Sequence, residues 1–163
     1  MSKHLLYIAT LMFFAAFPAK NYAQDVFNTI LKNAERIAES PTSNFLTVRI
    51  NQFKCSGLKY IRKKSVEMRD NVTAQFLDTQ AYNMAEFLEL FFKEVLRTKN
   101  MSAESKQRKM AVFKESSSSN PLFGDNDKTT AEAYIDDSNS VTPFSLDTDW
   151  EKAYATVVAR LKK

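Results

Sequence analysis

The chain has 163 residues, a formal charge of +4 at pH 7, one histidine, one cysteine and two glycines. The histidine, His4, lies in a segment that we expect to be removed, and its loss would exclude serine–histidine and cysteine–histidine nucleophiles. A lone cysteine excludes a dithiol redox pair, and two isolated glycines exclude a phosphate-binding glycine loop. Carboxylate chemistry, lysine chemistry or plain binding remain, and we expect no cofactor.

Residues 1–23 have the pattern of a cleaved export signal. A short positive start precedes an apolar run over residues 5–17, and the small residue Ala23 stands directly before Gln24. The run has 13 residues, whereas a helix needs about 20 apolar residues to cross a bilayer. We therefore favour cleavage after Ala23 over a retained membrane anchor, and we expect one soluble domain over residues 24–163, in the periplasm or outside the cell.

Charge is distributed in blocks of alternating sign along the expected mature chain. Residues 49–69 sum to +6, residues 70–92 to −4, residues 93–115 to +4 and residues 125–151 to −7. Such blocks indicate either neighbouring elements that attract each other in the folded chain or surfaces with oppositely charged partners.

Helices are favoured throughout, because glycine and proline are scarce and no segment shows sustained two-residue alternation. The first predicted helix spans residues 24–39, with apolar side chains at helical spacing along one face. Ser40 and Pro41 then predict an N-cap and a first-turn proline, so that a second helix begins there.

The second predicted helix runs from Pro41 to about residue 68. Its apolar face has three- and four-residue spacing and consists of Leu46, Ile50, Phe53, Gly57, Ile61 and Met68. Gly57 in this face indicates either a close approach of another helix or a break in this one. Cys55 has no partner cysteine, so we expect either a buried small side chain or an intermolecular partner.

The third predicted helix, over residues 72–98, has the strongest periodicity. Its broad apolar face consists of Phe76, Leu77, Gln80, Met84, Phe87, Leu88, Phe91 and Val95. A helix that is apolar over so much of its circumference is expected to lie centrally and to contact more than one neighbour.

The C-terminal third is predicted to be less regular. A helix over residues 102–116 ends at a run of serines, and about 30 irregular residues follow, whose apolar side chains argue against disorder. Capping boxes at Thr129 and Glu132 and at Thr148 and Glu151 predict a short helix and the start of the last helix. The expected fold is all-α, a compact bundle of about five helices with a long irregular segment before the last one.

Paired carboxylates are the candidates for catalysis, because a glycosidase needs one protonated and one ionised carboxyl group. Asp136 with Asp137, and Asp147 with Asp149, lie in the acidic segment. Asp147 and Asp149 also flank a helix start, where negative charge stabilises exposed amides. A carboxylate-dependent glycan hydrolase is therefore one alternative, and structural carboxylates are the other.

The same segment suggests a cation site. Asp125, Asp127 and Asp136 fall at positions one, three and twelve of a calcium-loop count. Thr130 occupies the sixth position, where the turn of such a loop needs glycine, and the capping box at Thr129 uses the same stretch. The count fails at the turn, so a metal site is an alternative that the sequence does not favour.

A basic run on the second predicted helix is the candidate binding surface. Lys59, Arg62 and Lys63 point away from the apolar face of that helix. Such a run can bind phosphates or an anionic envelope polymer, and it can equally be the charged outer face of a packed helix. The expected export argues against nucleic acid as the partner.

Two segments carry a resemblance to known proteins. Residues 76–82 (FLDTQAY) and 142–150 (TPFSLDTDW) resemble a group of small exported all-helical proteins of uncharacterised activity from Gram-negative anaerobes. The resemblance implies an exported helical fold and implies no activity, cofactor or site residue.

These observations together predict an exported helical protein that acts by binding or interaction rather than by catalysis. The partner is expected to be an envelope or extracellular protein or polymer, bound through the basic run or through the acidic segment over residues 125–149. A periplasmic chaperone or envelope-assembly factor is a further alternative, provided that several of the phenylalanines are exposed.

Overall fold

The computed structural model describes residues 23–68, 72–98, 100–125 and 142–162. These residues form α2 (Ala23–Ala38), α3 (Phe45–Met68), α4 (Ala74–Phe91), the π-helical turn η2 (Phe92–Leu96), α5 (Ala103–Ser118) and α7 (Trp150–Leu161). The predicted all-α fold is confirmed, and the described residues on either side of the segment 126–141 are irregular. The expected signal and the capping box at Thr129 and Glu132 lie outside the described residues.

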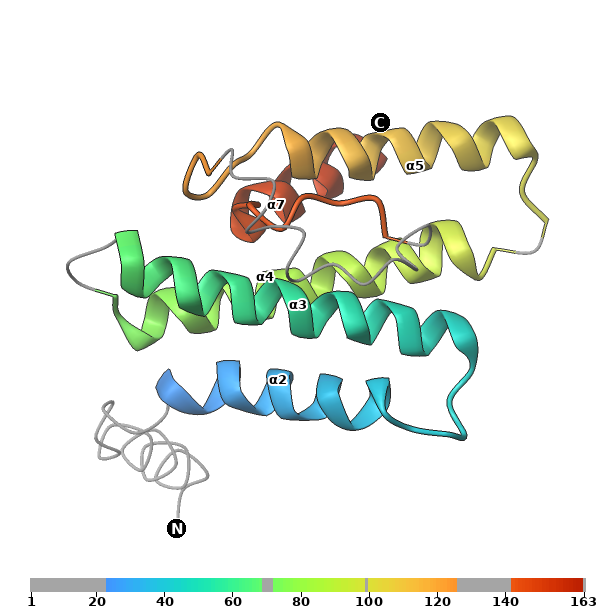
Figure 1. The fold of residues 1–163 in the computed structure, drawn as a ribbon. Helices are drawn as coiled ribbons and strands as arrows, with labels where there is room; N and C mark the ends of the chain where they lie inside the picture. Colours follow the sequence, from blue (N-terminus) through green and yellow to red (C-terminus); the bar gives the residue numbers. More distant parts are fainter. Residues whose placement is uncertain (1–22, 69–71, 99, 126–141, 163) are drawn as a thin grey trace, which may run out of the picture.

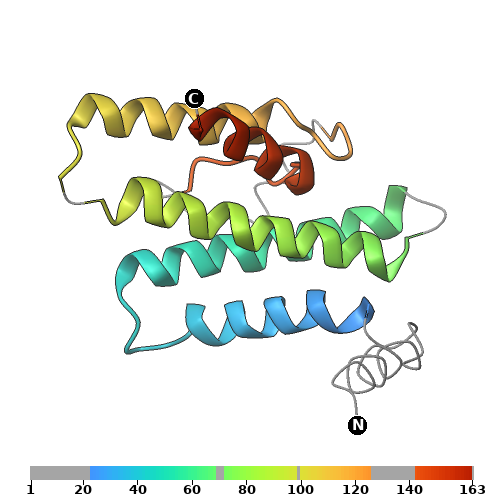
Figure 2. The ribbon, with the colours of Figure 1, turned by 180° about the vertical axis from the view of Figure 1, so that it is seen from behind.

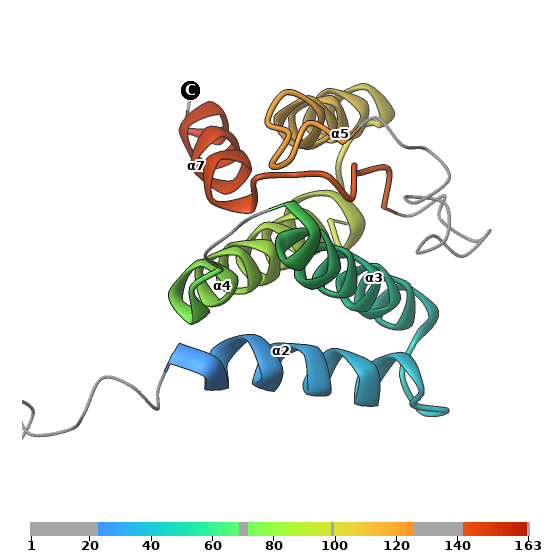
Figure 3. The ribbon, with the colours of Figure 1, turned by 60° about the vertical axis from the view of Figure 1, so that its left-hand side comes forward.

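The helices lie in tiers, with α3 and α4 in the middle (Figure 1). Helix α2 packs against both of them from one side, while α7 and α5 lie on the other (Figure 3). Seen from behind, α4 crosses in front of α3, and α7 lies above α4 (Figure 2). The segment 142–149 runs between the α5–α7 tier and the α3–α4 tier, so this irregular stretch is part of the interior (Figures 1 and 3).

Helix α4 is central, as its broad apolar face predicts. The buried side chains of this helix are Gln80, Ala81, Met84, Phe87, Leu88 and Phe91. They contact three neighbours, because α2, α3 and α7 all pack against α4. A helix surrounded in this way buries most of its apolar circumference, and the loss of water contact there is the main favourable term in folding.

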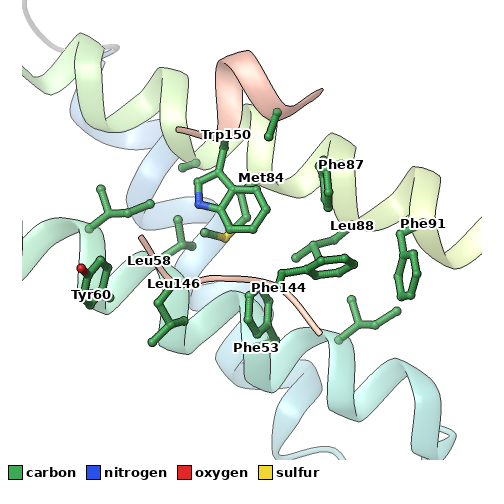
Figure 4. Packing of buried hydrophobic residues seen from close by; sticks show 14 of the residues in the cluster. Phe53, Leu58, Tyr60, Met84, Phe87, Leu88, Phe91, Phe144, Leu146 and Trp150 are labelled. Carbon is green, nitrogen blue, oxygen red and sulfur yellow. The ribbon is translucent and has the colours of Figure 1, made fainter. Parts of the chain in front are cut away.

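An aromatic cluster joins the tiers. Phe87 of α4 lies 5.1 Å from Phe144 and 5.2 Å from Trp150 between ring centroids, both in edge-to-face geometry. Phe53 of α3 contacts the same two rings at 5.9 and 6.1 Å. Figure 4 shows Phe144, Leu146 and Trp150 entering the core between α3 and α4. Edge-to-face packing of this kind adds to the stabilisation that burial gives.

Helix α4 ends in a wider turn that its sequence pattern does not predict. In η2, Arg97 donates its backbone N–H to the carbonyl of Phe92 at 2.9 Å, five residues earlier. Val95 in this turn is buried, and Glu94 forms an ion pair with Lys109 of α5. The π-helical turn thus directs one residue to the core and another to the neighbouring helix.

Gly57 permits a close approach between α3 and α4. A Cβ atom at Gly57 would lie 2.5 Å from Cε and 3.3 Å from Sδ of Met84, which is itself fully buried. Helix α3 continues through this residue to Met68. Of the two alternatives for Gly57, close helix packing is therefore correct and a helix break is wrong.

The predicted start of the second helix is wrong. Helix α3 begins at Phe45, and Asn44 Oδ1 accepts the backbone N–H of Thr47 at 3.0 Å. The Ser40 hydroxyl instead lies 3.1 Å from the hydroxyl of Thr42, within a turn after α2. Asparagine caps helices as well as serine does, so Ser40 and Asn44 are two competing helix starts. Helix α3 uses Asn44 as its cap.

Cys55 lies on α3 and is half-buried against the core. Burial raises the pKa of its thiol to about 11. The thiolate that disulfide exchange requires is therefore scarce near neutral pH. This favours a packing role for Cys55 over an intermolecular disulfide.

We expect Gly57→Ala to destabilise the fold by about 1–2 kcal/mol, because a methyl group there would overlap Met84 inside a packed core. In a Met84→Leu background the methionine tip is absent, so the cost should fall by about 1 kcal/mol. Urea unfolding of the wild type, both single variants and the double variant measures this coupling. An equal cost in both backgrounds would contradict the close contact.

Candidate functional site

Asp147 is buried and binds the backbone of an adjacent loop. Its Oδ1 accepts the N–H groups of Leu122 at 3.1 Å and Phe123 at 2.8 Å, and its Oδ2 accepts the N–H of Asp125 at 2.7 Å. Only 8% of Asp147 is exposed. A carboxylate that accepts three amide hydrogen bonds is strongly stabilised in place, because charged acceptors form the stronger hydrogen bonds. Asp147 therefore fixes residues 122–125.

The side chain of Asp125 continues this network to α3. Its Oδ2 accepts the hydroxyl of Tyr60 at 2.9 Å and lies 2.8 Å from Nζ of Lys64. The hydrogen bond to Asp125 raises the pKa of the Lys64 ammonium. A loop that follows α5 is thus attached to the middle tier through one carboxylate.

Asp125, the first position of the suggested calcium loop, therefore already has protein partners for its carboxylate. Asp127 and Asp136, which would complete the count, lie outside the described residues. Within the described part of the chain, no three cysteine, histidine, aspartate or glutamate side chains converge as a metal site would require.

Asp149 is the N-cap of α7. Its Oδ1 accepts the backbone N–H of Lys152 at 3.3 Å and the Nε2 amide of Gln80 at 3.2 Å, and its Oδ2 pairs with Lys152 Nζ at 2.9 Å. Gln80 Oε1 in turn accepts the backbone N–H of Trp150 at 2.8 Å. Burial opposes ionisation of Asp149, but the hydrogen bonds from Lys152 and Gln80 outweigh it and hold the pKa of this carboxyl below its usual value.

The capping box predicted at Thr148 is wrong by one residue. The Thr148 hydroxyl is buried, lies 2.8 Å from the hydroxyl of Ser117 and donates to the carbonyl of Ser145 at 2.7 Å. It is therefore unavailable to the amides of α7.

The serine run was also expected to follow the preceding helix, but α5 continues to Ser118, so Ser117 is helical and buried.

The described acidic candidates therefore have structural roles. Asp147 holds a loop and Asp149 caps a helix, and each is 8% exposed. A glycosidase needs two carboxyl groups that face one substrate, one of them kept protonated by an apolar pocket. Asp149 does not fit the protonated role, since the pKa of its carboxyl is lowered, and both of its oxygens already have partners within the fold. Asp136 and Asp137 lie outside the described residues.

The basic candidates lie on the exposed face of α3, as predicted. Lys59 Nζ is 2.9 Å from Glu35 of α2, and the hydrogen bond to Glu35 raises the pKa of Lys59. Lys63 pairs with Glu67 at 3.9 Å along the same helix. These contacts lie at the surface, where such pairs contribute roughly 0–1 kcal/mol and exchange partners readily.

Arg62 differs from its two basic neighbours because it is held against α2. Its Nη2 donates to Asn28 Oδ1 at 2.6 Å, and its guanidinium carbon lies 4.3 Å from the centroid of the Phe27 ring. The two contacts orient the guanidinium along the helix pair. Val66 follows one turn later on the same face and is 75% exposed.

Several residues in these networks were not predicted from the sequence. Gln80 was placed in an apolar face by its spacing, and a lone amide among apolar residues is the signal that could have indicated a buried polar contact. Tyr60, Lys64 and Lys54 carried no such signal. Lys54 is partly buried on α3, and burial lowers the pKa of its ammonium. The negative charge of Glu89 opposes this lowering of the pKa without reversing it.

Searches of protein-family models, curated proteins and solved structures found no match to this chain. Within the described residues, no helix has the length and apolar character needed to traverse a bilayer. The segments 76–82 and 142–150 meet in the fold, through the hydrogen bonds that join Gln80 to Asp149 and Trp150.

We expect Asp147→Asn to destabilise the fold by about 2 kcal/mol, because an amide nitrogen would face a backbone donor that the carboxylate now satisfies. Urea unfolding measures this loss. Glu115→Gln is the matched control, since Glu115 also loses one negative charge but pairs only at the surface with Arg160, and its cost should stay below about 0.5 kcal/mol. Equal costs for the two variants would show that Asp147 is not a structural anchor.

We expect Asp149→Ala to cost about 1 kcal/mol at pH 7 through loss of the helix cap. Because the pKa of Asp149 is lowered in the fold, its charge stabilises the native state above the usual carboxyl pKa, and this contribution disappears as the pH falls through the lowered value. The cost should therefore shrink between pH 5 and pH 3, whereas that of Ser102→Ala, an uncharged cap of α5, should not. A pH-independent difference between wild type and Asp149→Ala would refute this role.

Proposed function

We propose that this chain is an exported helical protein that acts by binding an envelope or extracellular polymer or protein, without catalysis. The observation that carries the proposal is the contrast between its charged groups. The described acidic candidates are committed to hydrogen bonds within the fold, whereas Lys59 and Lys63 are half-exposed and pair at the surface with Glu35 and Glu67.

The exposed face of α3 is the surface that fits this function best. Arg62 and Lys63 each lie three or four residues from both Lys59 and Val66, so the four side chains form one stripe along the helix. Three cations beside an exposed apolar side chain suit an anionic partner with some apolar surface. An anionic envelope polymer has this chemistry.

The hydrolase alternative has less support. It would have to use Asp136 and Asp137, because Asp147 and Asp149 already have structural partners. The chaperone alternative depended on exposed phenylalanines, and among the described phenylalanines Phe45 alone is exposed. Binding through a charged helix face is therefore the function that we propose.

The proposed export predicts which residue is the first one of the mature chain. When the full chain is expressed in a Gram-negative host, we expect the protein recovered from the periplasm to begin at Gln24, because the apolar run ends in a small-residue cleavage site. N-terminal sequencing measures this start. Recovery of the intact chain from the cytoplasm would contradict export.

The proposed surface predicts a specific loss of binding. Lys59→Gln with Lys63→Gln should weaken binding to heparin, used as a model anionic polymer, by about tenfold at low salt, because two exposed cations are removed from one stripe. Lys106→Gln with Lys114→Gln is the matched control, since both lysines are exposed on α5 and the change in net charge is the same.

Isothermal titration at two salt concentrations measures both double variants, and urea unfolding checks that each still folds. The control should bind within about twofold of the wild type. An equal loss in the two double variants would mean that net charge alone matters, and it would reject the stripe on α3 as the binding surface.

A further inference from the structure

The start of α2 is held, at the fifth residue of the helix, by a side chain from another helix. The backbone N–H of Phe27 donates to Oδ1 of Asp78, on the first turns of α4, at 2.8 Å. The two residues are 51 positions apart in the chain. This turn of α2 lies at the end of the bundle where α3 ends and α4 begins (Figures 1 and 2).

Helix starts need acceptors from outside the helix. The first four N–H groups of an α-helix have no carbonyl partner within it, and a nearby negative charge is favourable there. In a continuous helix, the N–H of Phe27 would pair with the carbonyl four residues earlier, which belongs to Ala23. Cleavage after Ala23 would remove that carbonyl and leave the N–H to another acceptor.

We infer that Asp78 caps α2 from outside the helix once residues 1–23 have been removed. The inference rests on the proposed export and on cleavage after Ala23. In the processed chain, Gln24 becomes the first residue, and Asp78, which already accepts the N–H of Phe27, remains as its acceptor after the Ala23 carbonyl is lost. Its negative charge also lies at the helix end where the new α-ammonium and the positive end of the helix dipole are found.

Arg62 holds the same turn from α3. Phe27 is 2% exposed, and Arg62 covers its ring while donating to Asn28. Chain termini usually fray unless they are fixed in this way. The new terminus would therefore be anchored three residues from its end by contacts from both middle helices, so α2 can remain docked after processing.

The test compares two chains that differ in whether residues 18–23, and with them the Ala23 carbonyl, are present. One begins at Gln24, and the other begins at Pro18, which restores the Ala23 carbonyl without the apolar run. Both contain the complete buried cluster, which extends from Phe27 to Val157. Urea unfolding gives the folding equilibrium constant of each chain, with and without Asp78→Ala.

We expect Asp78→Ala to lower the folding constant of the chain from Gln24 by at least about fivefold, as loss of a helix cap does, and that of the chain from Pro18 by clearly less. Asp78→Asn keeps an acceptor oxygen and should restore most of the loss. Ser102→Ala, which removes the cap of α5, should lower both constants by the same factor.

An equal effect of Asp78→Ala in the two chains, or no effect in the chain from Gln24, would overturn the inference. Neither measurement involves export or polymer binding. Failure of this coupling would therefore leave the proposed function in place, and failure of export would leave the measured coupling unchanged.

Discussion

The Asp147 carboxylate is the contact on which the C-terminal third of the structure depends. Its two oxygens accept three backbone N–H groups from residues 122–125, so the loop after α5 and the segment before α7 hold each other. With this segment fixed, Phe144 and Trp150 can occupy the space between the tiers. An irregular stretch thereby becomes part of the core, because its polar backbone groups have partners.

Helix α4 connects this arrangement to the other half of the bundle. Helix α2 packs against one side of α4. Helix α7 packs against another side, where the side-chain amide of Gln80 is hydrogen-bonded to Asp149 and Trp150. The close packing at Gly57 brings α3 against the same helix. Packing and hydrogen bonding therefore converge on α4, and a change at any of these contacts is expected to affect more than one tier.

Periodicity was sufficient to predict the helices, because three- and four-residue spacing reports directly on burial. The two incorrect helix starts have a local cause: Ser40 and Asn44, or Thr148 and Asp149, are both good caps, and only the tertiary contacts of each residue decide between them. The role of Asp147 depends on amides more than 20 residues away. Such a contact leaves no local pattern in the sequence, which is why the sequence favoured a structural role for Asp147 only through its position beside a helix start and did not predict the loop that it holds.

The central claim is that the buried carboxylate of Asp147 holds the backbone of the loop after α5. Hydrogen exchange measured by NMR on the amides of Leu122, Phe123 and Asp125 tests it most directly, because these N–H groups lie in a loop and owe their protection to Asp147. We expect exchange at least about a hundredfold slower than in an unstructured chain. Exchange at the rate of a free loop would contradict the account.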